Sequence, residues 1–143
     1  MNDIHRIGGW SAILYGIAFL VAFGLFIPTY TAMPAEALEP GNFAALLAAF
    51  DSLAPAQRSA LALGFALETV AVMLMFPAFL AVHGATKDKS EARAALALGM
   101  AALGIPFFML SVSSGFSLLQ LSDGFGTAGD VAQAARAAAY GDA

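Results

Sequence analysis

Glu68 is the ionisable residue whose position points most directly to chemistry. It is the one charged side chain in the apolar stretch 60–82, and a charge at the centre of a membrane helix costs at least about 2.5–3.5 kcal/mol on insertion scales. It lies nine residues after Ser59, which at about 1.5 Å per residue places it near the middle of a bilayer. We therefore expect its carboxyl group to be protonated or paired.

Hydroxyl groups are expected at the same depth in a later apolar stretch, 94–121. Counting nine residues back from Ser122 reaches Ser113, and other serines flank that position. The predicted intramembrane polar site consists of Glu68 with Ser111, Ser113, Ser114 and Ser117.

Three interpretations of Glu68 remain open. The residue is a proton or cation site, because desolvation favours its neutral form and allows proton exchange. Alternatively, it is a neutral acid whose hydrogen bond to a serine or a backbone carbonyl joins two helices. A third interpretation pairs it with a basic group on another subunit. The second is favoured, since the spans contain no further ionisable residue to continue a proton relay.

His5 and His83 fall at the same predicted membrane boundary, where two imidazoles could in principle bind haem or a metal. No carboxylate or second histidine follows either one at ligand spacing, and the chain has no cysteine. The sequence also has no phosphate-binding glycine motif, nucleophile elbow or His-Glu-x-x-His pair. We predict no catalytic residue, no metal and no cofactor, and therefore a protein that is not an enzyme.

The composition places the chain in lipid. Of its 143 residues, 60% are hydrophobic and only 11% are charged, with a mean hydropathy of +0.79, and a soluble domain of this size could not cover so much apolar surface. The net charge of −4 comes without a basic stripe that could follow phosphates. Membrane lipid is therefore an expected partner, and nucleic acid is not.

Three stretches are predicted to be transmembrane helices of an all-α integral membrane protein: 9–27, 60–82 and 94–121. The first has 19 residues, which span about 28 Å and match a hydrocarbon core of about 30 Å. Trp10 and Tyr30 bracket it at the headgroup levels. We expect it to be retained rather than cleaved as a signal peptide, because it exceeds a typical signal core.

The remaining segments are predicted to lie in water. A proline-rich outer loop, 28–59, contains a short helix at about 42–50 with Asn42 as its N-cap. Its apolar side is expected to lie on the membrane face or to dock a partner. The outer tail, 122–143, is a glycine-rich connector followed by an Ala-rich helix at about 130–140. All segments are assigned to one domain, 1–143.

Orientation follows from the lysines and arginines in the short flanks. Arg6, Lys87, Lys89 and Arg93 lie in the N-terminus and in the turn 83–93, whereas the other two segments contain only Arg58 and Arg136. The N-terminus is therefore expected in the cytoplasm of a bacterial cell and the C-terminus outside its inner membrane.

Small residues on two spans predict close helix packing. Gly8, Ala12, Gly16 and Gly24 recur at multiples of four in the first span, and Gly115 follows Ser111 at the same interval in the third. Such faces allow helix backbones to approach each other. Packing within the three-helix unit is favoured over packing against a different protein.

The opening Arg6-Ile7-Gly8-Gly9, which leads directly into an aromatic-rich helix, resembles the start of a family of uncharacterised bacterial multi-span inner-membrane proteins. The resemblance covers about the first 25 residues. It implies a bacterial membrane protein that is shorter than its relatives, and it implies no activity and no catalytic residue.

Three helices leave little room for a permeation route within one chain. The sequence therefore predicts a non-catalytic accessory or structural subunit of a larger bacterial membrane protein complex, with other membrane subunits as partners. The alternative is a small homo-oligomeric transporter or channel with Glu68 as its proton or cation site.

Overall fold

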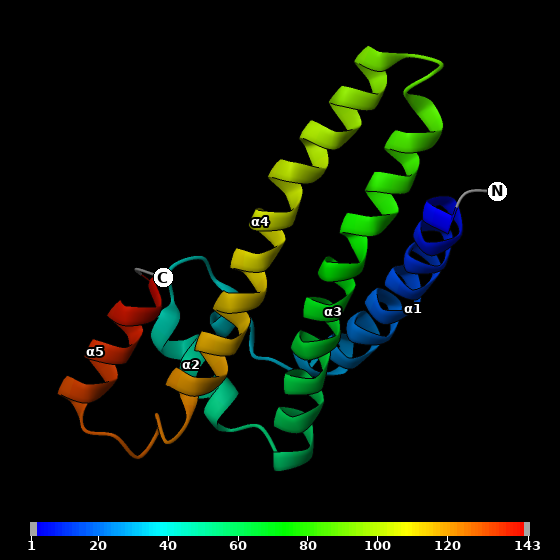
Figure 1. The fold of residues 1–143 in the computed structure, drawn as a ribbon. Helices are drawn as coiled ribbons and strands as arrows, with labels where there is room; N and C mark the ends of the chain where they lie inside the picture. The colour runs from blue at the N-terminus through cyan, green and yellow to red at the C-terminus, as the bar shows by residue number, and fades with distance from the viewer. Residues whose placement is uncertain (1–2, 142–143) are drawn as a thin grey trace. The chain divides into compact units, whose positions relative to one another are not determined.

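The computed structural model describes residues 3–141, apart from the side chain of Ile4, and within that range the protein is all-α (Figure 1). Five α-helices and one 3-10 helix follow one another along the chain, and no strand occurs among these residues. The elements are α1 (Asp3–Thr31), η1 (Ala35–Leu38), α2 (Phe43–Asp51), α3 (Pro55–Thr86), α4 (Glu91–Ser122) and α5 (Asp130–Gly141).

Three of these helices, α1, α3 and α4, are long and apolar enough to cross a membrane. The 32 residues of α3 and of α4 correspond to about 48 Å at 1.5 Å per residue, well beyond a hydrocarbon core of about 30 Å. The predicted class, an integral membrane protein with three transmembrane helices, is confirmed.

Both helices that flank the predicted outer loop 28–59 extend into it. At the first end, α1 continues through Pro28 to Thr31. A proline in the last turn removes only one backbone hydrogen bond, and the Thr31 hydroxyl donates to the Ile27 carbonyl oxygen at 2.8 Å.

At the other end, α3 begins at Pro55, where a missing N–H costs nothing because the first turn of a helix has no acceptor for it. The Gln57 side chain accepts a hydrogen bond from the Ala54 backbone N–H at 3.1 Å, as in a capping box. The predicted turn 83–93 is also shorter in the structure. Because α3 continues to Thr86 and α4 begins at Glu91, only residues 87–90 remain between the two helices.

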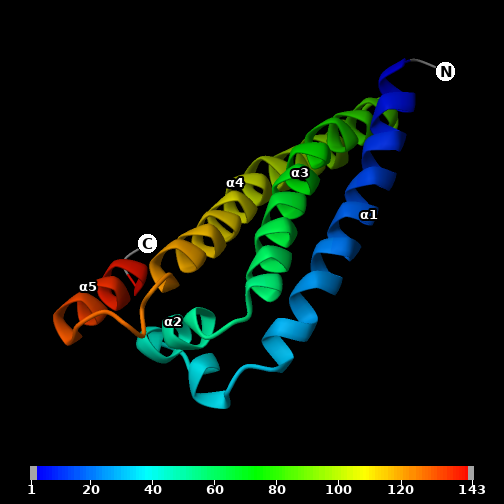
Figure 2. The same cartoon turned by 90° about the horizontal axis from the view of Figure 1, so that it is seen from below.

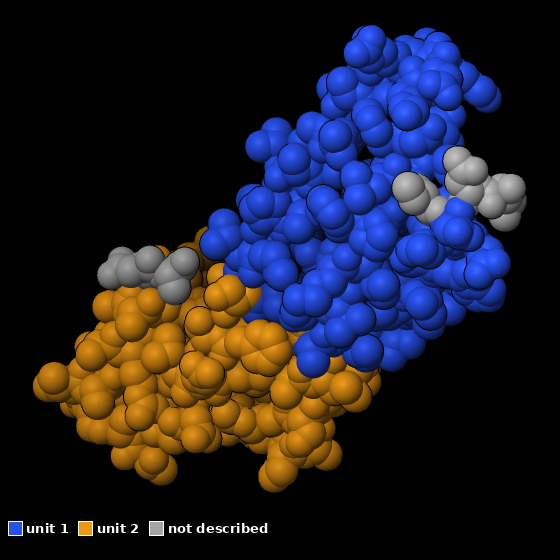
Figure 3. Space-filling view, viewed as in Figure 1, with its two compact units in different colours: residues 1–22, 66–112 blue, residues 23–65, 113–143 orange. Residues whose placement is uncertain are grey.

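The chain, expected as one domain, divides into two compact units, shown in different colours in Figure 3. Unit 1 takes residues 1–22 and 66–112, and unit 2 takes residues 23–65 and 113–143. Each of the three long helices contributes to both units.

In unit 1, α3 lies between α1 and α4 (Figures 1 and 2). On the α1 side, Gly8 lies so close to α3 that an added Cβ would overlap the Cβ of Ala81. On the α4 side, the His83 ring Nδ1 lies 3.2 Å from the Ala94 carbonyl oxygen. The outward positions of α3 in this unit, such as Val70 and Met73, are exposed apolar side chains.

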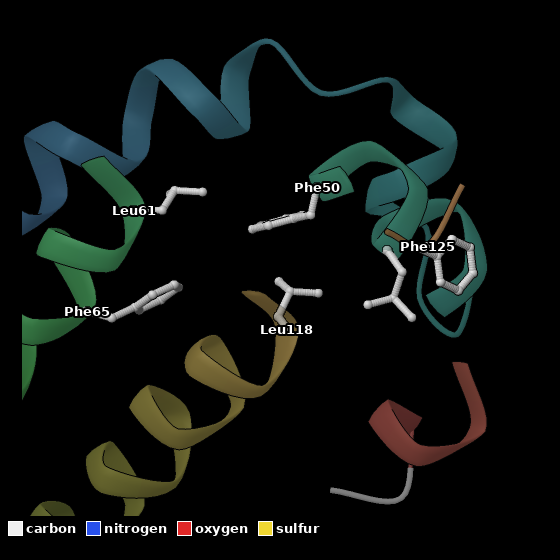
Figure 4. Close-up of a cluster of buried hydrophobic side chains, with 6 residues drawn as sticks. Phe50, Leu61, Phe65, Leu118 and Phe125 are labelled. Atoms are coloured by element: carbon white, nitrogen blue, oxygen red, sulfur yellow. The ribbon is translucent and has the colours of Figure 1, made fainter. Parts of the chain in front are cut away.

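Unit 2 contains a hydrophobic core that draws on α2, α3, α4 and the segment after α4 (Figure 4). The core is formed by Leu47, Phe50, Leu61, Phe65, Leu118 and Phe125. The expectation that the apolar side of α2 lies on the membrane or docks a partner is therefore corrected, since Leu47 and Phe50 are fully buried in the chain's own core. The predicted N-cap is confirmed, because the Asn42 side chain accepts a hydrogen bond from the Ala45 N–H.

Candidate functional site

Glu68 lies in the middle part of α3, 13 residues after Pro55 and 18 before Thr86. Between Arg58 and His83 it is the one ionisable side chain on this helix. These neighbours lie 10 and 15 residues away along the helix, or about 15 Å and 22 Å. If the hydrocarbon core, about 30 Å thick, lies between Arg58 and His83, then Glu68 lies at the depth of that core.

The face of α3 that carries Glu68 is defined by Phe79. The Phe79 side chain lines a cavity together with Ala12 and Tyr15 of α1, and it also lines a cavity together with Leu98 and Ala101 of α4. Phe79 therefore faces both neighbouring helices of unit 1.

Three residues precede Phe79 on the same helix face: Glu68, Val72 and Met75, at distances of 11, 7 and 4 residues, which are close to whole numbers of helical turns. Val72 is buried, whereas Val70 and Met73 on the opposite face are exposed. Glu68 is half-buried. Its side chain thus lies on the side of α3 that carries Phe79, and because it is only half-buried it stays partly accessible to another molecule.

Within unit 1, Glu68 makes no hydrogen bond and no ion pair with a described residue. A charged carboxylate at this depth would need a compensating partner. Its compensation must therefore come from a proton, from a group outside unit 1, or from another molecule.

The four serines predicted to surround Glu68 do not share one environment. Ser111, in unit 1, is exposed, and Ser113, in unit 2, is exposed as well. Ser114 and Ser117 are half-buried in unit 2. The hydroxyl-lined pocket remains a prediction.

The small-residue positions of α1 divide into two sets. Gly8 touches α3, and a Cβ at this position would also lie 3.0 Å from the Pro77 carbonyl oxygen. Gly16 and Gly24 have nothing within 4 Å of an added Cβ. Ala12 is exposed and lines a cavity of about 460 Å³ between α1 and α3, together with Gly8, Gly9 and Ala81. Unit 1 thus leaves a small-residue groove beside the contact that Gly8 makes.

Gly115, the small residue predicted on the third span, lies in unit 2 and faces Phe65. An added Cβ would overlap the Phe65 ring. That ring is itself enclosed, with centroid distances of 4.9 Å to Phe26 and 5.7 Å to Phe116. The glycine therefore allows α4 to lie close to an aromatic cluster.

The two histidines lie at the same end of unit 1 but in different contacts. A Cβ added at Gly84 would lie 3.7 Å from the His5 ring, whereas the His83 ring contacts the Ala94 carbonyl of α4. No group of three or more potential metal-binding side chains of His, Cys, Asp or Glu occurs among the described residues.

A polar network in unit 2 was missed by the sequence analysis, and its centre is Asp51 at the end of α2. One carboxylate oxygen of Asp51 accepts a hydrogen bond from the Gly124 N–H at 2.9 Å, and the other accepts from the Gly126 N–H at 2.8 Å. Arg58 lies 3.9 Å from the same carboxylate. Asp51 therefore holds the glycine-rich segment after α4 against α2.

Two arginines donate to carbonyl oxygens at helix ends, where the last backbone acceptors lack the N–H group four residues on in the helix. Arg58 donates to the Phe50 oxygen of α2 at 3.2 Å and to the Leu119 oxygen of α4 at 3.0 Å. Arg136 of α5 donates to the Leu121 and Asp123 oxygens at 3.4 Å and 2.6 Å. A signal for this network was present, because a cation at a helix N-terminus such as that of Arg58 opposes the helix dipole and so indicates a specific partner elsewhere.

Comparisons of the chain with protein-family models, with curated proteins and with solved structures gave no match. The fold and the site together define a class: an all-α integral membrane protein with three helices of spanning length and one acidic side chain at mid-span. The resemblance of the opening residues to bacterial multi-span proteins stays a prediction.

Proposed function

We propose that this protein is a non-catalytic subunit of a larger membrane protein complex in the bacterial inner membrane. The observation that carries the proposal is Glu68, which is half-buried in the middle part of α3 and makes no hydrogen bond or ion pair with a described residue of unit 1. An ionisable side chain inside a membrane span is usually paired with a specific partner that compensates its charge. A transmembrane helix of a second protein, with a basic or hydrogen-bonding side chain, would supply that partner.

The groove beside Gly8 supports this proposal. Small residues of α1 and α3, among them Gly9, Ala12 and Ala78, form part of its lining, beside larger side chains such as Tyr15 and Phe79. Helices associate in lipid chiefly through close backbone approach at such residues, because lipid offers no hydrophobic driving force between them. A partner helix could approach α1 here more closely than it could at a face of large side chains.

The test is purification of the tagged chain from its native membrane in a mild detergent. We expect a stoichiometric partner of different sequence with the wild type. Truncating one member of a desolvated charge pair costs about 2–5 kcal/mol, so Glu68→Gln and Glu68→Leu should each lower recovery of the partner at least about tenfold. Glu68→Asp should retain part of it.

The matched control is Met73→Gln, which places an amide of similar size on the exposed face of the same helix. This variant should recover the partner like the wild type. A wild-type chain that purifies without any other protein would overturn the proposal. Full recovery of the partner with Glu68→Gln would also overturn the proposal.

A homo-oligomeric transporter or channel is the second candidate, favoured by the partial exposure of the Glu68 side chain. In such an oligomer, the carboxyl groups of several copies would line a proton or cation path. Reconstituted wild-type protein should then carry a proton or monovalent cation flux that Glu68→Gln abolishes. Unchanged flux in the variant would remove this candidate.

A further inference from the structure

Unit 2 contains a cavity of about 340 Å³ that borders its hydrophobic core, since Leu118 lines it. Three aromatic side chains from three different elements line it: Tyr30 of α1, Phe43 of α2 and Tyr140 of α5. The acidic residue at the cavity is Glu39, in the segment between η1 and α2.

The cavity wall formed by residues 39–43 is held by specific local structure. Gly41 adopts φ +82°, a conformation that a residue with a Cβ rarely takes. The Asn42 side chain bridges the segment, since its Nδ2 donates to the Glu36 carbonyl oxygen at 3.0 Å and its Oδ1 accepts from the Ala45 N–H. These contacts give the wall a defined conformation.

Close packing between α2 and α5 forms the aromatic side of the cavity. The Phe43 and Tyr140 rings lie with their centroids 5.6 Å apart at an interplanar angle of 72°. Gly141 allows this approach, because an added Cβ would lie 2.8 Å from the Phe43 ring. The two rings consequently keep their positions relative to each other.

The charge around this cavity is negative. No lysine or arginine lines it, and the two arginines of unit 2, Arg58 and Arg136, donate to carbonyl oxygens elsewhere. Across the described residues of unit 2, five acids and two arginines give a formal charge of −3. Burial raises the pKa of Tyr140 above its ordinary value of 10.0, so its phenol is neutral at physiological pH.

We propose that this cavity binds an organic ammonium group. Aromatic rings attract a cation through their negative faces, and quaternary ammonium groups are recognised by cages of such rings. Glu39 would add a carboxylate at the cavity, with no basic side chain lining the site to repel the ligand. This inference is independent of the proposed membrane complex.

The ammonium group could belong to a lipid headgroup or to a free amine. Tyr30 lies at the end of a membrane helix, where the headgroup layer begins. Choline provides the shared chemistry of both sources and is therefore a suitable probe.

The test is titration of the full-length protein with choline, followed by the NMR shifts of its tyrosine and phenylalanine rings, in a detergent without an ammonium group. The comparison ligand is the neutral alcohol in which carbon replaces the nitrogen of choline. We expect choline to bind at least about fivefold more tightly, since the shapes match and only the charge differs. Equal binding of the two ligands would overturn the proposal.

Glu39→Gln and Glu36→Gln form a matched pair of variants. Both residues are exposed acids of the same segment, but only Glu39 lines the cavity. Choline affinity should fall about fivefold to tenfold in Glu39→Gln and stay unchanged in Glu36→Gln. An equal loss in both variants would indicate general charge attraction and would contradict a site.

Two variants at Tyr140 separate ring recognition from folding. Tyr140→Phe keeps the ring and should keep choline binding, whereas Tyr140→Leu should weaken it at least about fivefold. Loss of binding in both variants, or in neither, would contradict an aromatic site.

Repeating the titration in bilayer discs distinguishes a lipid headgroup from a free amine. Phosphatidylcholine discs should compete with free choline only if lipid headgroups enter the cavity, and phosphatidylglycerol discs are the reference.

Discussion

At the scale of single residues, the carboxylate of Asp51 joins two segments of unit 2 that are far apart in the sequence. Its two oxygens accept from two backbone N–H groups, and an arginine lies nearby. Hydrogen bonds to a charged acceptor contribute more than neutral ones. Because these partners follow α4 and Asp51 ends α2, one side chain connects segments that are 73 and 75 residues apart in the sequence.

Asp51→Ala should therefore destabilise unit 2 by about 1–3 kcal/mol, since it leaves the Gly124 and Gly126 N–H groups without their acceptor. The measurement is unfolding in detergent or bicelles, with hydrogen exchange at these two amides as a local readout. Asp123→Ala is the control, because the Asp123 side chain is 84% exposed and forms only an ion pair at 3.5 Å. If Asp123→Ala costs as much as Asp51→Ala, the clamp assigned to Asp51 is contradicted.

At the scale of helices, two glycines of α4 illustrate how the same residue type plays different roles. Gly115 faces the enclosed Phe65 ring, whereas Gly99 has nothing within 4 Å of an added Cβ. A glycine inside a helix lowers stability relative to alanine because of its backbone entropy. That cost is offset at Gly115 by the close approach it permits, and nothing in the structure offsets it at Gly99.

Gly115→Ala should destabilise the protein by about 1–3 kcal/mol, since the Phe65 ring has no free space to move into. Gly99→Ala should instead be neutral or stabilise it by up to about 1 kcal/mol through helix propensity. Both substitutions add the same methyl group to the same helix, so a difference in sign measures packing alone. Equal effects in thermal or denaturant unfolding would show that Phe65 adapts.

The long helices could be predicted from sequence because hydropathy is a one-dimensional property. An uninterrupted apolar run reports a span, and a single acid within it, Glu68, is visible without knowledge of the fold. The helix ends were less predictable, since Pro28 and Pro55 lie in terminal turns where proline is tolerated. A helix boundary was expected near each proline, whereas in the structure Pro28 lies within α1 and Pro55 is the first residue of α3.

The environment of α2 could not be predicted, because it depends on contacts between distant segments. Leu47 and Phe50 form a short apolar pattern that fits a membrane surface as well as a protein core. Only the packing of Leu118 and Phe125 against them, from a distant part of the sequence, shows that they belong to a protein core and not to a membrane surface. The Asp51 and Arg58 contacts share this origin, and so sequence reasoning found the isolated acid but missed the paired one.

At the scale of the whole molecule, the number of membrane spans determines which connecting segments lie on the same side of the bilayer. If α4 crosses the bilayer, residues 87–90 before it and the segment from Asp130 after it lie on opposite sides, whichever way the protein is inserted. The distribution of lysine and arginine then decides the orientation. Residues 83–93 hold Lys87, Lys89 and Arg93, which predicts that this turn lies in the cytoplasm.

Site-specific labelling can test both statements, because the natural chain has no cysteine to interfere. Lys89→Cys and Ala132→Cys introduce single thiols at exposed positions on either side of α4. With a membrane-impermeant maleimide on bacterial cells whose outer barrier is removed, Ala132→Cys should react at once and Lys89→Cys only after lysis. The reverse pattern would contradict the inside N-terminus alone. Labelling of both from the same side would contradict the crossing of α4, and with it the prediction that the C-terminal segment lies outside the cell while the turn that carries Lys89 lies inside.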